Sequence, residues 1–249
     1  MITGLGAAGI RVVLLDIEGT TTPIAFVHET LFPYARARVR SWFTSKSASD
    51  PDVRDIVSGL GDELRAEGRP FDAASWDVSS GTWQLDAVIA RVNELMDEDR
   101  KSRALKTLQG RIWEDGYAGG ELKGDVYADV PDALERWTTA GIGVGIFSSG
   151  SVLAQKLLFA NSTAGDLTRF LRWHFDTAVG PKLEASSYRR ILQSLGVDSR
   201  SVLFISDVPR ELDAARDAGL ATLLAVRPPA TAPDASNHPV IRSFDGVEA

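Results

Sequence analysis

The sequence predicts an α/β fold: a Rossmann-like parallel sheet as the core, with a mainly α-helical cap inserted after the first strand. Three observations predict it. Short apolar runs suited to buried strands recur along the chain, segments of helical periodicity separate them, and a long helical stretch follows the first run. Strands that alternate with helices form βαβ units, which build a parallel sheet with helices on its faces.

Four segments have the character of buried strands, because they are short and apolar at successive positions. They are residues 11–15, 142–147, 202–205 and 221–226. A strand that is apolar on both faces is typical of the interior of a parallel sheet. We therefore expect these runs at the centre of the sheet, and we expect a further strand end at residues 177–181.

Apolar residues at helical spacing lie between the later strands. They predict helices around residues 134–137, 188–195 and 212–215. Gly196 directly follows the second of these stretches and is a typical helix stop. The order of elements in this half of the chain is therefore that of successive βα units.

The first and second strands are too far apart for a simple crossover. A βαβ unit needs only about 30 residues, whereas residues 16–141 separate these two strands. Apolar stripes at helical spacing occupy residues 29–43, 85–96 and 105–112, and residues 66–81 have the Gly, Asp, Ser and Pro content of a loop.

The long helical stretch predicts a core of residues 1–25 and 120–249 and a helical cap of residues 26–119. Ligands of parallel α/β sheets bind beyond the carboxyl ends of the strands. An insertion directly after the first strand begins at that edge. We therefore expect the cap to close over a site there and exclude water.

Composition and charge exclude several classes of protein. The 249 residues carry a formal net charge of −7 and no cysteine, which excludes thiolate nucleophiles, Cys-ligated zinc and iron–sulfur clusters. The acidic balance argues against a nucleic-acid partner. The apolar runs are too short to span a membrane, and no basic secretory leader is present, so we expect a cytoplasmic protein.

Polar residues follow the predicted strand ends. They are Asp16 and Glu18 after the first strand, Ser148 and Ser149 after the second, Lys182 after residues 177–181, and Ser206 and Asp207 after the strand at 202–205. Each alone has an ordinary interpretation as a capping or surface residue. The carboxyl ends of parallel strands meet at one edge of the sheet, so their coincidence there indicates a functional site.

The three carboxylates of this set, Asp16, Glu18 and Asp207, need a cation. Two like charges about 4 Å apart repel by about 4 kcal/mol at an effective dielectric constant of about 20. All-oxygen ligation favours Mg²⁺, and we expect one Mg²⁺ per subunit. A cation, Lys182 and hydroxyl donors are what a transferring phosphoryl group needs, with Asp16 as a candidate nucleophile and Glu18 suited to proton transfer.

These positions resemble the four motifs of the haloacid dehalogenase superfamily. The motifs are residues 16–24 (Asp-Ile-Glu-Gly-Thr-Thr-Thr-Pro-Ile), residues 148–151 (Ser-Ser-Gly-Ser), Lys182, and Ser206 with Asp207. Most phosphatases of the superfamily carry Asp where this chain has Glu18. That difference, together with residues 104–110, 148–159 and 174–177, resembles the enolase-phosphatase (acireductone synthase) family of methionine salvage. The resemblance covers about residues 11–227.

The resemblance implies a bifunctional reaction. The substrate 2,3-diketo-5-methylthiopentyl-1-phosphate is enolised and then dephosphorylated to the acireductone. Asp16 is implied as nucleophile and Mg²⁺ ligand. Glu18 is implied as general acid and base, with a second metal contact through its main-chain carbonyl.

The resemblance assigns the remaining roles in the same way. Ser148 and Ser149 hold phosphate or carbonyl oxygens of the substrate, and Lys182 neutralises phosphoryl charge. Asp207 is the second carboxylate ligand of the metal, and Glu211 orients a metal-bound water. The base for enolisation is left open, with Glu18 as a candidate.

Two alternatives remain. One is an Mg²⁺-dependent phosphatase of the same superfamily that acts on another small phosphorylated metabolite, because the sequence does not identify the cap residues that select the substrate. The other is a catalytically silent binding module, against which the intact charged residues argue. We expect a small phosphate ester as the bound molecule, no nucleic-acid or membrane partner, and a monomer.

Overall fold

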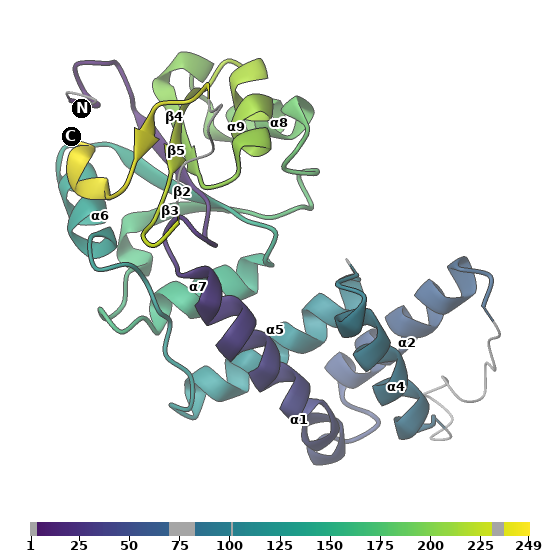
Figure 1. The fold of residues 1–249 in the computed structure, drawn as a ribbon. Coiled ribbons are helices and arrows are strands. Elements are labelled where there is room, and N and C mark those ends of the chain that lie inside the picture. The colour runs from purple at the N-terminus through teal and green to yellow at the C-terminus, as the bar shows by residue number, and fades with distance from the viewer. Residues whose placement is uncertain (1–3, 70–82, 101, 231–236) are drawn as a thin grey trace. The chain divides into compact units, whose positions relative to one another are not determined.

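The computed structural model describes residues 4–69, 83–100, 102–230 and 237–249. The chain forms two compact units (Figure 1). Unit 1 is Met1–Val27 with Lys123–Ala249, and unit 2 is His28–Leu122. The functional division that the sequence predicts, with a cap at residues 26–119, stays a prediction.

Unit 1 contains a six-stranded sheet in the order β3-β2-β1-β4-β5-β6, and all neighbouring strands are parallel. The strands are β1 (Val12–Leu15), β2 (Gly143–Phe147), β3 (Leu171–Phe175), β4 (Val202–Ser206), β5 (Ala221–Ala225) and β6 (Val240–Ile241). The four predicted strands correspond to β1, β2, β4 and β5. The predicted fold class, a parallel α/β sheet with a helical insertion after the first strand, is confirmed.

The strand end predicted at residues 177–181 is wrong. The preceding strand is β3, and it ends at Phe175. Residues 177–180 form a turn in which the Asp176 carboxylate accepts a hydrogen bond of 2.8 Å from the Ala178 amide. Gly180 follows at a φ of 130°, which does not continue a strand. Lys182 therefore lies beyond a turn and not directly at a strand end.

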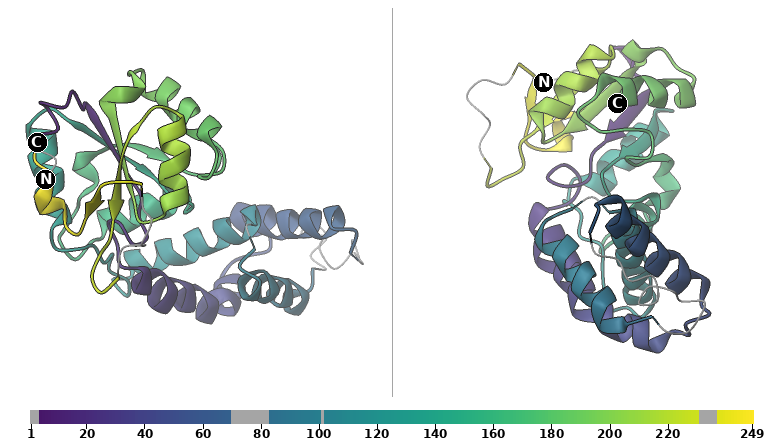
Figure 2. Two further views of the ribbon diagram at one scale, coloured as in Figure 1. Left: turned by 45° about the horizontal axis from the view of Figure 1, so that its top comes forward. Right: turned by 90° about the vertical axis from the view of Figure 1, so that its right-hand side faces the viewer.

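Helices cover both faces of the sheet. They are α6 (Val130–Thr139), α7 (Val152–Ala160), α8 (Ala185–Leu195) and α9 (Pro209–Asp217), with short 3₁₀ turns at η3 (Thr168–Phe170), η4 (Ser199–Ser201) and η5 (Phe244–Gly246). Figures 1 and 2 show α8 and α9 on one face and α6 on the other. Three of these helices, α6, α8 and α9, were predicted, and Gly196 ends α8 in the left-handed conformation at a φ of 68°.

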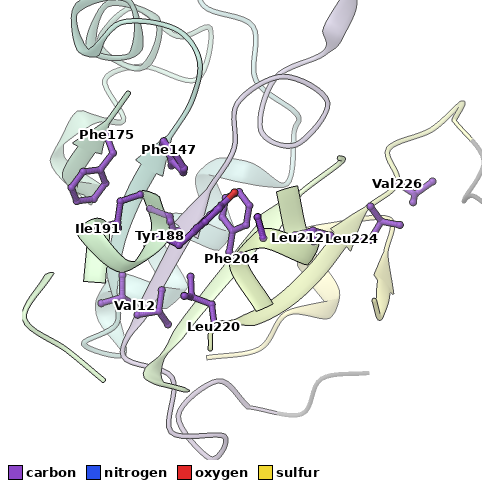
Figure 3. Packing of buried hydrophobic residues seen from close by; sticks show 14 residues of the cluster. Val12, Phe147, Phe175, Tyr188, Ile191, Phe204, Leu212, Leu220, Leu224 and Val226 are labelled. Atoms are coloured by element: carbon purple, nitrogen blue, oxygen red, sulfur yellow. The ribbon is translucent and has the colours of Figure 1, made fainter. Parts of the chain in front are cut away.

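A continuous apolar core lies between the sheet and the pair α8 and α9 (Figure 3). Tyr188 of α8 packs between two strands, with its ring centroid 5.4 Å from that of Phe147 and 5.3 Å from that of Phe204. Burial of a side chain of this size contributes about 1.5–3 kcal/mol. This core fixes the carboxyl ends of β2 and β4 relative to α8.

In its described residues, 28–69, 83–100 and 102–122, unit 2 consists of helices joined by turns and short irregular segments. After the π-helical turn η1 (Phe26–Leu31), its helices are α1 (Phe32–Ser45), α2 (Pro51–Ala66), α4 (Leu85–Asp97) and α5 (Arg103–Ala118). The three predicted apolar stripes lie on α1, α4 and α5. The loop predicted at residues 66–81 falls largely outside the described residues.

Helix α2 was not predicted, although its start has clear signals. Asp50 caps it by accepting hydrogen bonds from the amides of Asp52 and Val53, and Pro51 occupies the first turn. No helix in the described parts of the chain has the length and hydrophobicity that a membrane span requires.

Candidate active site

The carboxyl ends of the three central strands lie level with one another. Leu15 of β1 pairs with Ile146 of β2 and with Ile205 of β4. Asp16 and Ser148 therefore follow their strands at the same edge as Asp207. This edge is where ligands of parallel α/β sheets bind.

Three charged side chains from distant parts of the sequence meet at this edge. The Lys182 Nζ lies 2.7 Å from Asp16 Oδ1 and 2.6 Å from Glu211 Oε2. All three residues are buried, with exposures of 5% for Asp16, 6% for Lys182 and 9% for Glu211. One lysine thus serves two carboxylates in a dry environment, where charge interactions are strong.

Ser206, the last residue of β4, connects the same two carboxylates. Its Oγ lies 3.0 Å from Asp16 Oδ2 and 3.1 Å from Glu211 Oε2. A hydroxyl has one proton, so it donates to one of these carboxylates at a time. The Ile17 amide adds a hydrogen bond of 2.7 Å to Asp16 Oδ1. These contacts fix the orientation of the Asp16 carboxylate.

The pKa values in this cluster are perturbed by burial and by charge. Burial alone lowers the pKa of the Lys182 ammonium, but the Asp16 and Glu211 carboxylates outweigh it, and the pKa is raised above its ordinary value. Burial, followed by the Asp16 charge, raises the pKa of Glu211 to about 7. The lysine therefore stays charged, and the crowding of negative charge raises the pKa of Glu211.

The hydrophobic core holds the main chain of Lys182 in place. The Tyr188 hydroxyl donates a hydrogen bond of 2.8 Å to the Lys182 carbonyl. The Ser187 hydroxyl donates one of 2.7 Å to the carbonyl of the preceding residue, Pro181. Lys182 therefore reaches the carboxylates from a segment fixed by α8, although that segment is a turn.

The loop after β1 is a compact turn built on one carbonyl. The amides of Thr20, Thr21 and Thr22 all donate to the carbonyl of Ile17. Gly19 lies within it at a φ of 66°, and a Cβ at this position would overlap the Asp207 carboxylate. The turn therefore requires glycine for two reasons, its conformation and the close approach of Asp207.

Asp207 provides the test of whether the site fits a metal ion. Its carboxyl group is half-buried at the end of β4, and burial together with the Asp16 charge raises its pKa to about 7. A carboxyl group whose pKa is raised by a neighbouring carboxylate is a suitable ligand for a divalent cation, which would offset that negative charge. Asp16, Asp207 and the main-chain carbonyl of Glu18 offer only oxygen atoms, and oxygen is the ligand type that Mg²⁺ prefers.

Metal-binding side chains alone do not make a site. Within the described residues, no group of three or more His, Cys, Asp or Glu side chains is placed to hold a metal ion. The three-carboxylate cluster expected from residue types is therefore not found there. A set of two carboxylates and one main-chain carbonyl has only two such side chains and is therefore not counted as such a group. The side chain of Glu18 is half-buried on the loop.

Ser148 and Ser149 lie at the end of β2. Ser148 is 4% exposed, and its hydroxyl accepts a hydrogen bond of 3.1 Å from the Gly150 amide. Ser149 is half-buried. Gln155 of α7 secures this turn by donating to the carbonyls of Gly150 and Phe175, at 3.0 and 2.8 Å.

The structure therefore brings Asp16, Lys182 and Asp207 together, with Ser148 and Ser149 one strand away. The roles of Ser206 and Gln155 were not predicted. Both are polar residues buried at 0% and 1% exposure. A hydroxyl at the end of an apolar run was the available signal for Ser206, whereas the contacts of Gln155 depend on the tertiary fold.

Comparisons with known proteins show the family of the chain. The model of the haloacid dehalogenase-like hydrolase family matches residues 10–219. Enolase-phosphatase E1 of Synechococcus elongatus is 48% identical over 236 residues, which cover 95% of this chain and 97% of the relative. Enolase-phosphatase E1 of Drosophila mojavensis is 46% identical over 242 residues, with 96% and 95% covered.

A solved structure shows the same likeness. The UTR4 protein (Unknown transcript 4 protein) of Saccharomyces cerevisiae superimposes with a TM-score of 0.76 at 37% identity, over 95% of this chain and 99% of that one. The identity with these relatives extends over nearly the whole chain and includes both units. The chain therefore belongs to the enolase-phosphatase E1 family of the haloacid dehalogenase-like hydrolases.

Proposed function

We propose that this chain converts 2,3-diketo-5-methylthiopentyl-1-phosphate to the acireductone by enolisation followed by dephosphorylation, as a step of methionine salvage. The observation that carries the proposal is the buried Asp16 carboxylate, held 2.7 Å from Lys182 at the carboxyl edge of the sheet. A family whose members are named enolase-phosphatases supports the choice of reaction.

Asp16 is the proposed nucleophile of the phosphatase step. A carboxylate oxygen attacks phosphorus, the ester bond to the substrate oxygen breaks, and an acyl phosphate forms. Water then attacks this acyl phosphate and releases inorganic phosphate. The contacts to Ser206 and to the Ile17 amide hold the attacking group in one orientation, which favours in-line attack.

Glu18 is the proposed general acid and base. It gives a proton to the leaving oxygen in the first half of the phosphatase step and removes one from the attacking water in the second half. Its position two residues after Asp16, on the turn closed at Ile17, supports this role.

Lys182, Ser148 and Ser149 are proposed to bind oxygens of the substrate. The Lys182 charge neutralises part of the phosphoryl charge, and it also stabilises a developing enolate on the same substrate. Ser148 and Ser149 offer hydroxyls at the neighbouring strand end. One set of charges at one edge of the sheet thus supports both steps.

Mg²⁺ is the proposed cofactor, one per subunit, held by Asp16, Asp207 and the Glu18 carbonyl. When bound, it offsets the negative charge of the phosphoryl group. Glu211 pairs with Lys182 and is the proposed partner of a metal-bound water. The crowding that raises the pKa of Asp207 supports this ligand set.

We propose that the protein acts as a monomer in the cytoplasm. The proposal for location is supported by the relation to metabolic enzymes and by the lack of a membrane-spanning helix in the described residues. Light scattering coupled to size-exclusion chromatography tests the monomer. A mass of twice the chain mass at micromolar concentration would contradict it.

The activity is tested with the purified protein and the diketo phosphate ester under exclusion of oxygen. Phosphate release and enediol absorbance are followed together, with Mg²⁺, with chelator, and with Asp16→Asn. Asp198→Asn is the matched control, because Asp198 is an exposed capping residue whose amide variant keeps an acceptor for the Arg200 amide.

Both signals are expected from the wild type and from Asp198→Asn, with loss of phosphate release on chelation and in Asp16→Asn. Cleavage of a generic phosphate ester without cleavage of the diketo ester would refute the substrate and leave a phosphatase for another small metabolite. No turnover of either ester would favour a silent binding module.

A further inference from the structure

A buried arginine outside the four motifs contacts the loop that carries Asp16 and Glu18. Arg227 follows β5, and its side chain is 5% exposed. Its Nε donates a hydrogen bond of 2.9 Å to the main-chain carbonyl of Thr20. Thr20 is fully buried and lies two residues after Glu18. The guanidinium thus reaches the main chain of the proposed catalytic loop.

The guanidinium is itself held firmly on its other sides. Its Nη1 lies 2.5 Å from Asp129 Oδ2. The rings of Tyr127 and Phe244 lie against it, with centroids 4.5 and 4.3 Å from the central carbon. Few rotamers of the arginine satisfy all of these contacts, so the position of its Nε is well defined.

Asp129 anchors both Arg227 and the C-terminal segment. It stands at the N-cap position of α6, yet its side chain makes no capping bond to that helix. Its Oδ2 accepts hydrogen bonds from the Ser243 hydroxyl and the Phe244 amide, at 2.9 and 2.5 Å. These bonds and Arg227 hold the pKa of Asp129 below its ordinary value despite burial. The carboxylate stays charged and anchors the arginine.

Stability alone is a weak reason for a charge at this position. Buried ion pairs are often no more stabilising than apolar residues of similar volume. Arg227 is also incompletely satisfied, because its buried Nη2 has no hydrogen-bond partner in the part of the chain that the structure describes. Arg227 supplies the loop with a hydrogen-bond donor of fixed direction, which an apolar side chain could not do.

The hydrogen bonds within the loop do not fix its orientation, which depends on contacts with other parts of unit 1. The amides of residues 20–22 donate to the Ile17 carbonyl and that of Gly19 to the Thr22 carbonyl, and these bonds close the turn without attaching it to its surroundings. Two attachments come from elsewhere in unit 1. The Tyr127 amide donates to the Thr21 carbonyl at 3.0 Å, and Arg227 donates to the neighbouring Thr20 carbonyl.

We propose that Arg227, anchored by Asp129, is a positioning residue that fixes the loop at residues 17–22 and thereby sets the placement of Glu18. The proposal rests on the proposed role of Glu18 in proton transfer. It extends the site to a residue just after β5 and to the N-cap residue of α6, neither of which touches the reacting atoms. Loss of the contact is expected to slow the chemical step more than it weakens substrate binding.

The first test is a comparison of kcat and KM at a temperature well below the melting point of each variant. Arg227→Met is expected to lower kcat by about 10–100-fold with KM changed by less than about 3-fold, since a small misplacement of a catalytic group acts on the chemical step. Arg227→Lys keeps the charge but lacks the paired donors, so it should fall between Arg227→Met and the wild type.

Arg136→Met is the matched control. Arg136 is a half-buried arginine of α6 whose Nη2 donates to the Phe244 carbonyl at 3.0 Å, so it secures the same C-terminal segment without a described contact to the loop. This variant is expected to lose stability and keep the wild-type kcat. A similar loss of kcat in Arg136→Met and Arg227→Met would reduce Arg227 to a structural role.

The second test is hydrogen exchange, which needs no substrate and stands even if the proposed reaction is wrong. The amides of residues 19–22 are expected to exchange at least about 10-fold faster in Arg227→Met and in Asp129→Asn than in the wild type, and unchanged in Arg136→Met. Unchanged loop exchange with unchanged kcat in Arg227→Met would overturn the proposal. Inactivity of the wild type on the diketo ester would instead count against the proposed function.

Discussion

Lys182 is shared by two carboxylates that would otherwise repel each other. Asp16 and Glu211 lie 2.7 and 2.6 Å from its Nζ, and all three groups are withdrawn from water. The arrangement places the Asp16 carboxylate beside a positive charge, in a fixed position from which it can act as a nucleophile. It also makes the site sensitive to loss of any one member, because a buried charge without its partner is costly.

Lys182→Met removes the shared cation and leaves both carboxylates buried. Truncation of one partner in a buried charge network costs about 3–5 kcal/mol of unfolding free energy. Loss of one charge-stabilising group costs about 10²–10³ in kcat. Urea unfolding and steady-state kinetics measure the two effects. The control is Lys123→Met at an exposed lysine of unit 1, which should change neither. Wild-type kcat in Lys182→Met would contradict its assigned role.

The raised pKa of Asp207 predicts how stability depends on pH when no metal is bound. The pKa is about 7 in the folded chain against an ordinary value of 3.8. Between these values the folded state holds a proton that the unfolded chain has released. The free energy of unfolding therefore falls as pH rises through this window.

We expect the melting temperature of the chelator-treated protein to fall by on the order of a few degrees between roughly pH 5 and pH 8. Asp207→Asn should show a smaller slope, because its side chain does not titrate. Glu211, with a pKa of about 7, accounts for the slope that remains. Differential scanning fluorimetry measures both. Equal slopes for variant and wild type would show that Asp207 is not perturbed.

At the level of elements, the turn after β1 is the part of the site with the least freedom. Gly19 is in the left-handed conformation at a φ of 66°, and Asp207 occupies the space where a Cβ would lie. Strand β4 therefore limits the turn on one side, and the hydrogen bond from Arg227 to Thr20 limits it on another. A substitution in this turn is expected to act on activity beyond its effect on stability.

Gly19→Ala tests this expectation, with Gly68→Ala as the matched control. Gly68 has nearly the same φ, 67°, but nothing lies within 4 Å of its Cβ position. Both variants incur the left-handed strain of about 1 kcal/mol. Only Gly19→Ala displaces Asp207, so it alone should lose kcat, by at least about 10-fold. Equal activity of the two variants would mean that the close approach to Asp207 has no functional importance.

Three of the four strands predicted from the sequence are buried almost uniformly, and the fourth, β5, is buried over its last three residues. β1, β2 and β4 are buried along their length or nearly so, and this gives uninterrupted apolar runs. β3 escaped prediction because it is an edge strand of sequence Leu-Arg-Trp-His-Phe, in which only the first and last residues are buried. A strand with charged and exposed positions has no signature in a single sequence. β6 has two residues and is too short to predict.

Site residues, like strands, were predicted where a local pattern in the sequence marks them. Asp16 and Asp207 follow predicted strands, and Lys182 directly follows the segment that was expected to end a strand. Arg227 also follows a predicted strand, but a lone arginine beside two prolines is typical of a surface loop. Its partners, Asp129 and Phe244, are about 100 residues away on one side and about 17 on the other. Contacts of this kind become visible only with tertiary structure.

At the level of the whole molecule, unit 1 provides the sheet edge and all of the ion pairs of the proposed site. Unit 2 is a cluster of helices with its own ion pairs, in which the buried Arg91 guanidinium contacts the partly exposed Glu67 and Glu94. The described charged residues of the proposed site therefore all lie in unit 1. Binding of a metal ion to this unit should stabilise the fold as a whole.

Saturation with Mg²⁺ is expected to raise the melting temperature of the chelator-treated protein. A ligand at about 100 times its dissociation constant adds about 2.7 kcal/mol, which corresponds to about 5–10 °C for a chain of this length. Asp207→Asn should lose most of this increase, and Asp198→Asn should keep it. An equal increase in both variants would place the metal elsewhere. No increase in the wild type at millimolar Mg²⁺ would argue against a resident cation.

The proposed mechanism depends most on Asp16 as the group that attacks phosphorus. The most direct measurement is a single turnover with the diketo phosphate ester under nitrogen, stopped by rapid acidification and followed by mass spectrometry of the peptide that contains β1. We predict one phosphoryl group on Asp16 in the wild type and none in Asp16→Asn. Turnover with the phosphoryl group on another residue, or with Asp16 unmodified at every time point, would contradict the account.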